Sequence, residues 1–208
     1  LGGGKKTAAE KAGRAKHDPL AEYRSSPYTN IEDGPTRIQG LGSWFKQAMM
    51  TAALDTPGAK KAQIGRLVYV MGDRVDIYGV PKLMMAITRS ADINKTPDVR
   101  TRAILPRWAC VVRVSFAKPI INAQSIATLL ASGGITSGVG DWRIQKGSGS
   151  YGAYRLCAKD DPEFVAILKQ GRKAQDEALE SPECYDDETR DLLSWYDVEV
   201  KRRGLKVA

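Results

Sequence analysis

Apolar side chains recur at three- and four-residue intervals in two segments of the chain, which is the pattern of a helix with one buried face. The first segment covers about residues 44–54, with Ser43 placed to cap the helix start and Pro57-Gly58 to stop the chain from continuing as helix. The second begins after Asn122 and is expected to end at Gly133-Gly134. The pattern therefore predicts two helices that pack on a core.

Alternating apolar and polar residues predict strands beside these helices. Residues 108–116 give the clearest alternation, and residues 66–70 and 75–78 flank Gly72-Asp73 in the manner of a short hairpin. Residues 151–157 are expected to form a last strand after the second helix. A strand, a helix and a strand in this order predict a right-handed crossover.

The remaining segments lack such periodicity. Residues 1–36 contain few large apolar side chains, so we expect a flexible basic arm. Between residues 80 and 106 arginines and lysines are interleaved with prolines, which predicts an exposed basic excursion. Residues 159–208 are expected to form an acidic helical extension, because thirteen acids face five bases between residues 159 and 200.

The charge of the whole chain favours an anionic partner. Lysines and arginines number 32 against 24 aspartates and glutamates, which gives a formal net charge of +8. Nucleic acid is the commonest partner of this kind, although a basic protein that simply stays in solution has the same balance.

Cellular location is predicted from the cysteines and from apolar run lengths. The three cysteines, Cys110, Cys157 and Cys184, are odd in number and fit a reducing compartment. No apolar run approaches about 18 residues and no signal peptide is recognisable, so we expect a cytoplasmic protein with no membrane partner. Since the chain begins at Leu1 rather than Met, a processed product or a fragment is expected.

Candidate catalytic groups are scarce. The single histidine, His17, falls in the arm, and no Cys or His pair has the spacing of metal ligands. The acidic run Asp186-Asp187-Glu188 is better explained by a helix start than by a metal site. We therefore expect no enzymatic activity, no metal and no cofactor.

The most informative segment is the glycine-rich stretch at residues 133–152, which contains seven glycines. Glycines let the backbone approach a ligand and turn its N–H groups outward as an anion nest. Trp142 offers a stacking plane, and Arg143 and Lys146 supply positive charge, a combination suited to unpaired bases. The alternative is a long flexible loop with a buried Trp142. A Walker phosphate loop is excluded because no Gly-Lys-Ser/Thr follows the glycines.

Two stretches carry a resemblance to a known family. Residues 38–49, Ile-Gln-Gly-Leu-Gly-Ser-Trp-Phe-Lys-Gln-Ala-Met, are similar to an apolar-Pro-Gly-Ser-Ser-apolar-Lys-Gly-Ala-Leu helix start, and residues 138–143, Gly-Val-Gly-Asp-Trp-Arg, with Lys146-Gly147 and Ser150-Tyr151-Gly152, are similar to a Gly-Ile-Gly-Asp-Trp-Arg-Pro-Glu-Lys-Gly motif with a trailing Phe-Gly. Over about residues 10–157 the chain thus resembles the RAMP superfamily, whose members include the crRNA-binding backbone subunits of CRISPR effector complexes, and more closely a group of phage and prophage proteins. Gln39 departs from the family's Pro, and the family's first strand is expected to be missing.

The resemblance implies an α+β fold. Residues 37–158 would form a ferredoxin-like, RRM- and RAMP-like antiparallel sheet with two packed helices, and residues 80–106 would be a thumb-like insertion. In this family the first helix start, the thumb and the glycine loop line a nucleic-acid groove. The residues that this assigns to nucleic-acid binding are Ser43, Lys46, Gln47, Arg89, Lys95, Arg100, Arg102, Arg107, Gly138, Gly140, Trp142, Arg143 and Lys146.

We therefore expect a phage-encoded protein of the host cytoplasm that coats single-stranded DNA or RNA as a homo-oligomer or filament. The alternative is a phage structural or assembly protein whose basic core and acidic extension bind copies of each other without nucleic acid. A guide-RNA endonuclease is disfavoured because it needs a suitably placed base such as His or Lys. The sequence does not distinguish a DNA strand from an RNA strand, because contacts to the 2′-hydroxyl decide between them.

Overall fold

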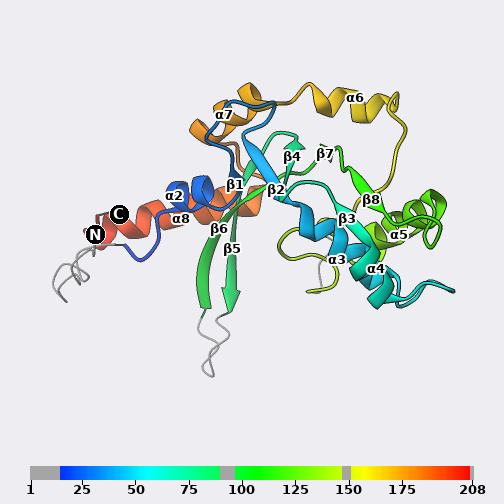
Figure 1. Cartoon of the computed structure of the whole chain (residues 1–208). Coiled ribbons are helices and arrows are strands. Elements are labelled where there is room, and N and C mark those ends of the chain that lie inside the picture. The colour runs from blue at the N-terminus through cyan, green and yellow to red at the C-terminus, as the bar shows by residue number, and fades with distance from the viewer. Residues whose placement is uncertain (1–14, 90–96, 147–150, 207–208) are drawn as a thin grey trace, which may run out of the picture. The chain divides into compact units, whose positions relative to one another are not determined.

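The computed structural model describes residues 15–89, 97–146 and 151–206 (Figure 1). The chain divides into two compact units, which are treated separately below. One is built from the described parts of Leu1–Tyr28, Gly79–Arg107 and Lys173–Ala208, and the other from those of Thr29–Tyr78 and Trp108–Arg172. Both contain helices and antiparallel strands, so the predicted mixed α+β class is confirmed.

The unit formed by residues 29–78 and 108–172 has two small sheets. The strand β4 (Arg74–Tyr78) pairs antiparallel with β2 (Ile38–Leu41) and with β7 (Ala109–Cys110), in the sheet order β1-β2-β4-β7, where β1 is Tyr28–Thr29. A separate two-stranded sheet joins β3 (Val68–Val70) to β8 (Val114–Phe116).

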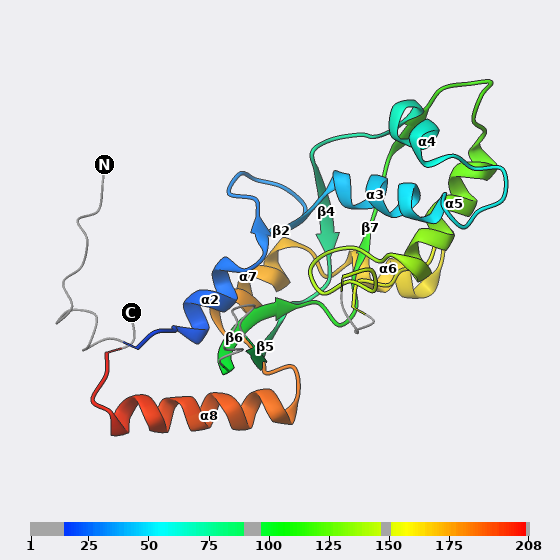
Figure 2. The same ribbon diagram turned by 90° about the horizontal axis from the view of Figure 1, so that it is seen from below.

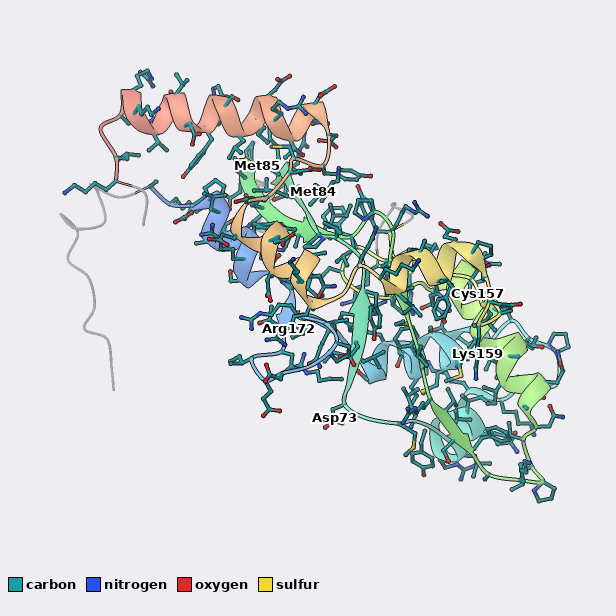
Figure 3. All side chains as sticks on the ribbon, turned by 90° about the horizontal axis from the view of Figure 1, so that it is seen from above. Asp73, Met84, Met85, Cys157, Lys159 and Arg172 are labelled. Carbon is teal, nitrogen blue, oxygen red and sulfur yellow. The ribbon has the colours of Figure 1, made fainter. Side chains whose placement is uncertain are left out.

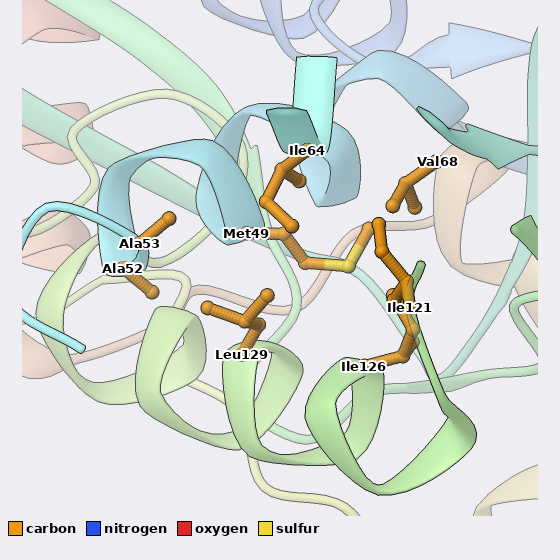
Figure 4. Packing of buried hydrophobic residues seen from close by; sticks show 8 residues of the cluster. All are labelled: Met49, Ala52, Ala53, Ile64, Val68, Ile121, Ile126 and Leu129. Carbon is orange, nitrogen blue, oxygen red and sulfur yellow. The ribbon is translucent and has the colours of Figure 1, made fainter. Parts of the chain in front are cut away.

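Helices α3 (Gly42–Ala52) and α5 (Ala123–Thr136) lie side by side in this unit (Figure 2). With α4 (Lys61–Leu67) they enclose its apolar core, which Figure 4 shows from close by. The core cluster consists of Met49, Ala52, Ala53, Ile64, Val68, Ile121, Ile126 and Leu129. A further helix, α6 (Pro162–Leu168), follows later in the chain.

The predicted hairpin at Gly72-Asp73 is wrong, because β3 and β4 pair with different strands. Gly72 has a positive φ of 84°, and the carbonyl of Asp73 accepts a hydrogen bond of 3.0 Å from the N–H of Gly42. A side chain on Gly42 would collide with the Gly72 carbonyl oxygen. The turn therefore docks on the start of α3 and does not fold β4 back on β3.

The sequence pattern predicts no strand directly before the first helix, but the structure has one there. β2 lies directly before α3, with Ile38 and Gly40 buried and alternating with less buried neighbours. This strand leads into a helix that begins at Gly42, and Ser43 makes no capping hydrogen bond. The predicted Ser43 cap is therefore wrong by position: Ser43 lies in the first turn.

The predicted second helix is correct at its start and wrong at its end. The Asn122 side chain accepts a hydrogen bond of 2.8 Å from the N–H of Ser125, as a cap should. The helix then continues through Gly133 and Gly134, both buried, to Thr136. These glycines permit close packing inside the helix and do not terminate it.

Two predicted strands differ in the structure. Residues 108–116 form β7 and β8 with a break at residues 111–113, although the even-numbered positions are less exposed than most of their neighbours. Residues 151–157 contain an isolated bridge between Arg143 and Tyr151 and no regular strand. The predicted strand-helix-strand crossover is therefore wrong at its second strand.

The other unit is built on a long antiparallel ribbon of β5 (Lys82–Arg89) and β6 (Pro97–Ile104). Helices α2 (Pro19–Ser25) and α8 (Asp187–Arg202) pack against it, and α7 (Arg172–Glu180) precedes α8. The core cluster of this unit is Ala15, Tyr23, Leu83, Met85, Tyr196 and Val200, and Figure 3 labels Met85 beside Met84 on β5. The expected loss of periodicity after residue 80 is wrong for β5, because Leu83 and Met85 alternate with more exposed residues.

His17 is buried in this unit, although the sequence predicts it in a flexible arm. Only 8% of the residue is exposed, with Nδ1 2.5 Å from Glu22 Oε1 and Nε2 2.7 Å from Asp98 Oδ1. Each ring nitrogen thus lies within hydrogen-bond distance of one carboxylate. Asp98 also pairs with Lys16 at 2.9 Å and with Arg100 at 3.2 Å. These contacts join the segment before α2 to β6.

The Asp98 cluster predicts a pH-dependent contribution to stability. The hydrogen bond from Lys16, with a smaller contribution from His17, lowers the pKa of Asp98 from 3.8 to about 2. A carboxylate with a lowered folded-state pKa stabilises the fold above its unfolded pKa, and this stabilisation is lost as the pH falls through the folded value. We expect Asp98→Asn to lower the free energy of unfolding by about 1–3 kcal/mol at pH 7.

Urea unfolding of wild type and Asp98→Asn, followed by circular dichroism, measures this contribution. The difference between the two proteins should narrow as the pH falls from about 4 towards 2, the range between the two pKa values. Asp160→Asn, at an exposed position, is the control and should change little. A difference that stays constant from pH 7 to pH 3 would contradict the role assigned to Asp98.

Candidate nucleic-acid interface

A pocket of about 310 Å³ lies in the unit of residues 29–78 and 108–172. It is lined by Ser43, Trp44, Gln47, Gly138, Arg143 and Lys146. All of these except Trp44 are predicted nucleic-acid-binding residues. The structure thus brings the first turns of α3 together with the glycine-rich stretch, two segments that are far apart in the sequence.

Helix α3 presents one exposed edge to this pocket. Ser43 and Gln47 are exposed and lie four residues apart, so they share a helix face. Trp44 is half-buried, and a side chain on Gly40 would lie 3.0 Å from its Cζ3 atom. The sequence assigns Trp44 only to the buried face of the helix, because its apolar spacing gives no sign of a pocket wall.

The glycine-rich side is closed by backbone hydrogen bonds. Gly138 donates to the Gly133 carbonyl at 2.9 Å, and Val139 donates to the Gly152 carbonyl at 2.9 Å. Gly138 and Gly152 have positive φ values of 65° and 72°, which favour glycine. A side chain on Gly152 would also collide with the carbonyl oxygen of Val139. These residues, Gly138 and Val139 with Gly152, form the base of the loop, and this loop base is tightly packed.

The glycine-rich stretch is predicted to turn its N–H groups outward as an anion nest. This prediction is wrong for four residues of the loop. The N–H groups of Gly138, Val139, Gln145 and Lys146 donate to carbonyls within the protein. Among the residues that line the pocket, Arg143 and Lys146 carry positive charge on their side chains. The Arg143 guanidinium donates to the Gly140 carbonyl at 3.2 Å, which orients it against the loop.

Trp142 is exposed, so the alternative of a buried tryptophan is wrong. Its exposed fraction is 59%, and its φ of 50° lies in a region that bulky residues rarely adopt. Gly140, two residues earlier, has a φ of 82°. These two residues shape the turn that holds the Trp142 ring outward, beside Arg143 but outside the pocket lining.

An aromatic cluster holds the segment after the loop against α3. The ring of Tyr154 lies 5.8 Å from the ring of Phe45 and 6.3 Å from that of Trp108, centroid to centroid, in edge-on geometry. Burial raises the pKa of Tyr154 to about 12, and its hydroxyl has no hydrogen-bond partner among the described residues. The tyrosine thus acts here mainly through its ring.

The remaining predicted residues do not line the pocket. Lys46 places its Nζ 5.0 Å from the ring centroid of Tyr69. Arg89, Arg100, Arg102 and Arg107 belong to the other unit, where Arg100 pairs with Asp98 and Arg102 donates to the Thr101 carbonyl. Lys95 lies outside the described residues.

A larger pocket of about 570 Å³ in the other unit is less suited to an anion. Its lining holds two bases and three acids, and the bases are already paired, Lys82 with Glu183 at 3.1 Å and Arg190 with Asp187. The smaller pocket, with Arg143 and Lys146 in its wall, is therefore the better candidate for a phosphate.

The described residues offer little support for other kinds of site. Within the described residues, no group of three or more His, Cys, Asp or Glu side chains could hold a metal ion. No described helix has the length and apolar composition needed to cross a membrane. Cys110, Cys157 and Cys184 are free, and burial raises the pKa of Cys110 to about 12.

No family model, curated protein or solved structure matches this chain. The resemblance to the RAMP superfamily therefore rests only on the two sequence motifs described above.

The closed loop base predicts unequal effects of two glycine substitutions. Gly140→Ala meets open space and should cost about 1–2 kcal/mol of stability, because only its positive φ is disfavoured. Gly152→Ala carries the same backbone penalty and also collides with the Val139 carbonyl, so it should cost more. Thermal denaturation compares the two variants. Equal destabilisation would show that the loop base is not closed around Gly152.

Proposed function

We propose that the pocket formed by α3 and the glycine-rich loop binds single-stranded nucleic acid, and that copies of the protein coat the strand together. The observation that carries this proposal is the convergence of Arg143 and Lys146 with Ser43, Trp44 and Gln47 around one pocket. Among the residues that line the pocket, α3 supplies an aromatic ring and neutral hydrogen-bonding groups, and the glycine-rich loop supplies the positive charge.

The chemistry of the lining suits an unpaired nucleotide. Arginine and lysine bind phosphate through charge, and serine and glutamine side chains add hydrogen bonds. Trp44 in the wall and the exposed ring of Trp142 beside it offer surfaces for bases, worth about 1–3 kcal/mol per stacked base. A volume of about 310 Å³ is small for a ligand pocket, which favours one nucleotide over a duplex.

The order of elements supports a relation to ferredoxin-like domains of the RAMP type. β2, α3, the β3 and β4 segment, the β7 and β8 segment and α5 follow the β-α-β-β-α order, and the β5-β6 ribbon is inserted between the two middle segments like a thumb. One departure is that β2 pairs with β4, whereas the first strand of a ferredoxin-like sheet lies between the third and fourth. A phage origin and a location in the host cytoplasm belong to the same proposal.

A second candidate is a self-assembling structural protein that takes up no nucleic acid. Helix α8 favours it, because Trp195 and Val198 lie three residues apart and are 55% and 65% exposed. Light scattering with and without added strand separates the two functions. Assembly that needs the strand supports coating, and assembly that ignores it supports the structural role.

The first experiment is a fluorescence-anisotropy titration of labelled single-stranded DNA, single-stranded RNA and duplex at two salt concentrations. Wild type should bind single strands and lose affinity steeply as salt rises. Arg143→Ala/Lys146→Ala removes two cationic contacts, so the slope of log affinity against log salt should fall by about 1.4, at about 0.7 per contact for single strands.

Lys118→Ala/Lys169→Ala is the matched control, because it removes the same charge from exposed positions outside the pocket. It should keep most of the wild-type salt slope. Failure of wild type to bind any single strand at low salt would overturn the proposed function. An equal loss in the control variant would overturn the location of the site.

A further inference from the structure

The two-stranded sheet of β3 and β8 has one face in the core and one face in solvent. Val68 is fully buried, and Val70, Val114 and Phe116 pack against the core. Side chains alternate along a strand, so Tyr69 and its partner Ser115 point the other way. Tyr69 is 57% exposed, as is Met71 at the strand end.

The Tyr69 ring is held in place on this open face. Its hydroxyl donates to the carbonyl of Arg66 at 2.8 Å, and the Lys46 ammonium lies 5.0 Å from the ring centroid. The separation is typical of a cation–π contact. A fixed, half-exposed aromatic ring loses little conformational entropy when a planar ligand stacks on it.

Lys46 connects this ring to the pocket. On helix α3 it lies three residues from Ser43 and next to Gln47, and both of those residues line the pocket. Side chains three apart on a helix are neighbours, at about 5–6 Å between Cβ atoms. The pocket, the Lys46 ammonium and the Tyr69 ring therefore follow one another along the surface of the same unit.

The charge around the open face favours a polyanion. Arg66 and Arg113 are exposed at its margins, and the exposed side chains on the face are Tyr69, Met71 and Ser115. Basic side chains beside an exposed aromatic ring are the arrangement that binds unpaired nucleotides.

We infer that Tyr69 is a second base-stacking position, and that Lys46 binds the phosphate between this position and the pocket. The inference rests on the proposed function and extends it from one pocket to a path that spans more than one nucleotide. The strand would leave the pocket over Lys46 and place a neighbouring base on the open face of β3 and β8. Stacking involves the ring of Tyr69, and every nucleobase has a flat face that can stack on it. Recognition at this position would therefore be independent of sequence.

The test compares Tyr69→Leu and Tyr69→Phe on a labelled oligothymidine and on the same strand with abasic sites. Tyr69→Leu should weaken binding of the strand with bases by about fivefold to a hundredfold, as expected for one lost stacking contact. It should leave binding of the abasic strand unchanged, because phosphate contacts remain. Tyr69→Phe keeps the ring but loses the hydrogen bond to the Arg66 carbonyl, so it should weaken binding of the strand with bases much less than Tyr69→Leu does and leave the abasic strand unchanged.

Two outcomes would overturn the inference while the pocket survives. One is equal binding of the strand with bases by wild type and Tyr69→Leu. The other is an equal loss on both strands, which would mean that the substitution acts without any base contact. In either case, continued dependence on Arg143 and Lys146 would keep the proposed function intact. Absence of binding by wild type would overturn the proposed function, and the Tyr69 position with it.

Discussion

The close approach of three backbone segments is the constraint on which the candidate site depends. A side chain on Gly133 would lie 2.9 Å from the carbonyl of Ala48 in α3, and one on Gly134 would collide with the carbonyl of Tyr154. Gly152 meets Val139 in the same way. Hence α3, α5 and the segment after the loop can pack at this distance only because these positions carry no side chain.

This packing explains how a glycine-rich loop supports a defined site. Glycine normally adds backbone freedom, which costs conformational entropy on folding. Here the loop base is fixed by hydrogen bonds from Gly138 and Val139 and by the packing of Tyr154 on Phe45. Arg143 and Lys146 are therefore carried on a short turn with two anchored ends, facing a helix whose opposite side is in the core.

The sequence predicts the pocket better than it predicts the strands. The resemblance to the RAMP superfamily assigns five of the six lining residues to nucleic-acid binding, because it singles out the start of the first helix and the motif at residues 138–146. The hairpin at Gly72-Asp73 fails because turn residues indicate where the chain bends and not which strands pair afterwards. Gly133 and Gly134 fail as a helix end because composition does not distinguish a glycine that ends a helix from one that permits contact.

Local sequence patterns also give no sign of the contacts that Tyr69 and His17 make with distant residues. Tyr69 sits in an alternating run in which the exposed positions are read as solvent-facing, and only the contact with Lys46 marks it as part of a surface next to the pocket. His17 lies in a segment with few large apolar neighbours, yet its partners Glu22 and Asp98 come from α2 and β6. Pairing between distant segments is absent from local periodicity. In the proposed interface, the positive charge of Arg143 and Lys146 lies on side chains, and a strand longer than one nucleotide would need a further cation. We propose Lys46 for that role, because its ammonium lies 5.0 Å from the Tyr69 ring centroid.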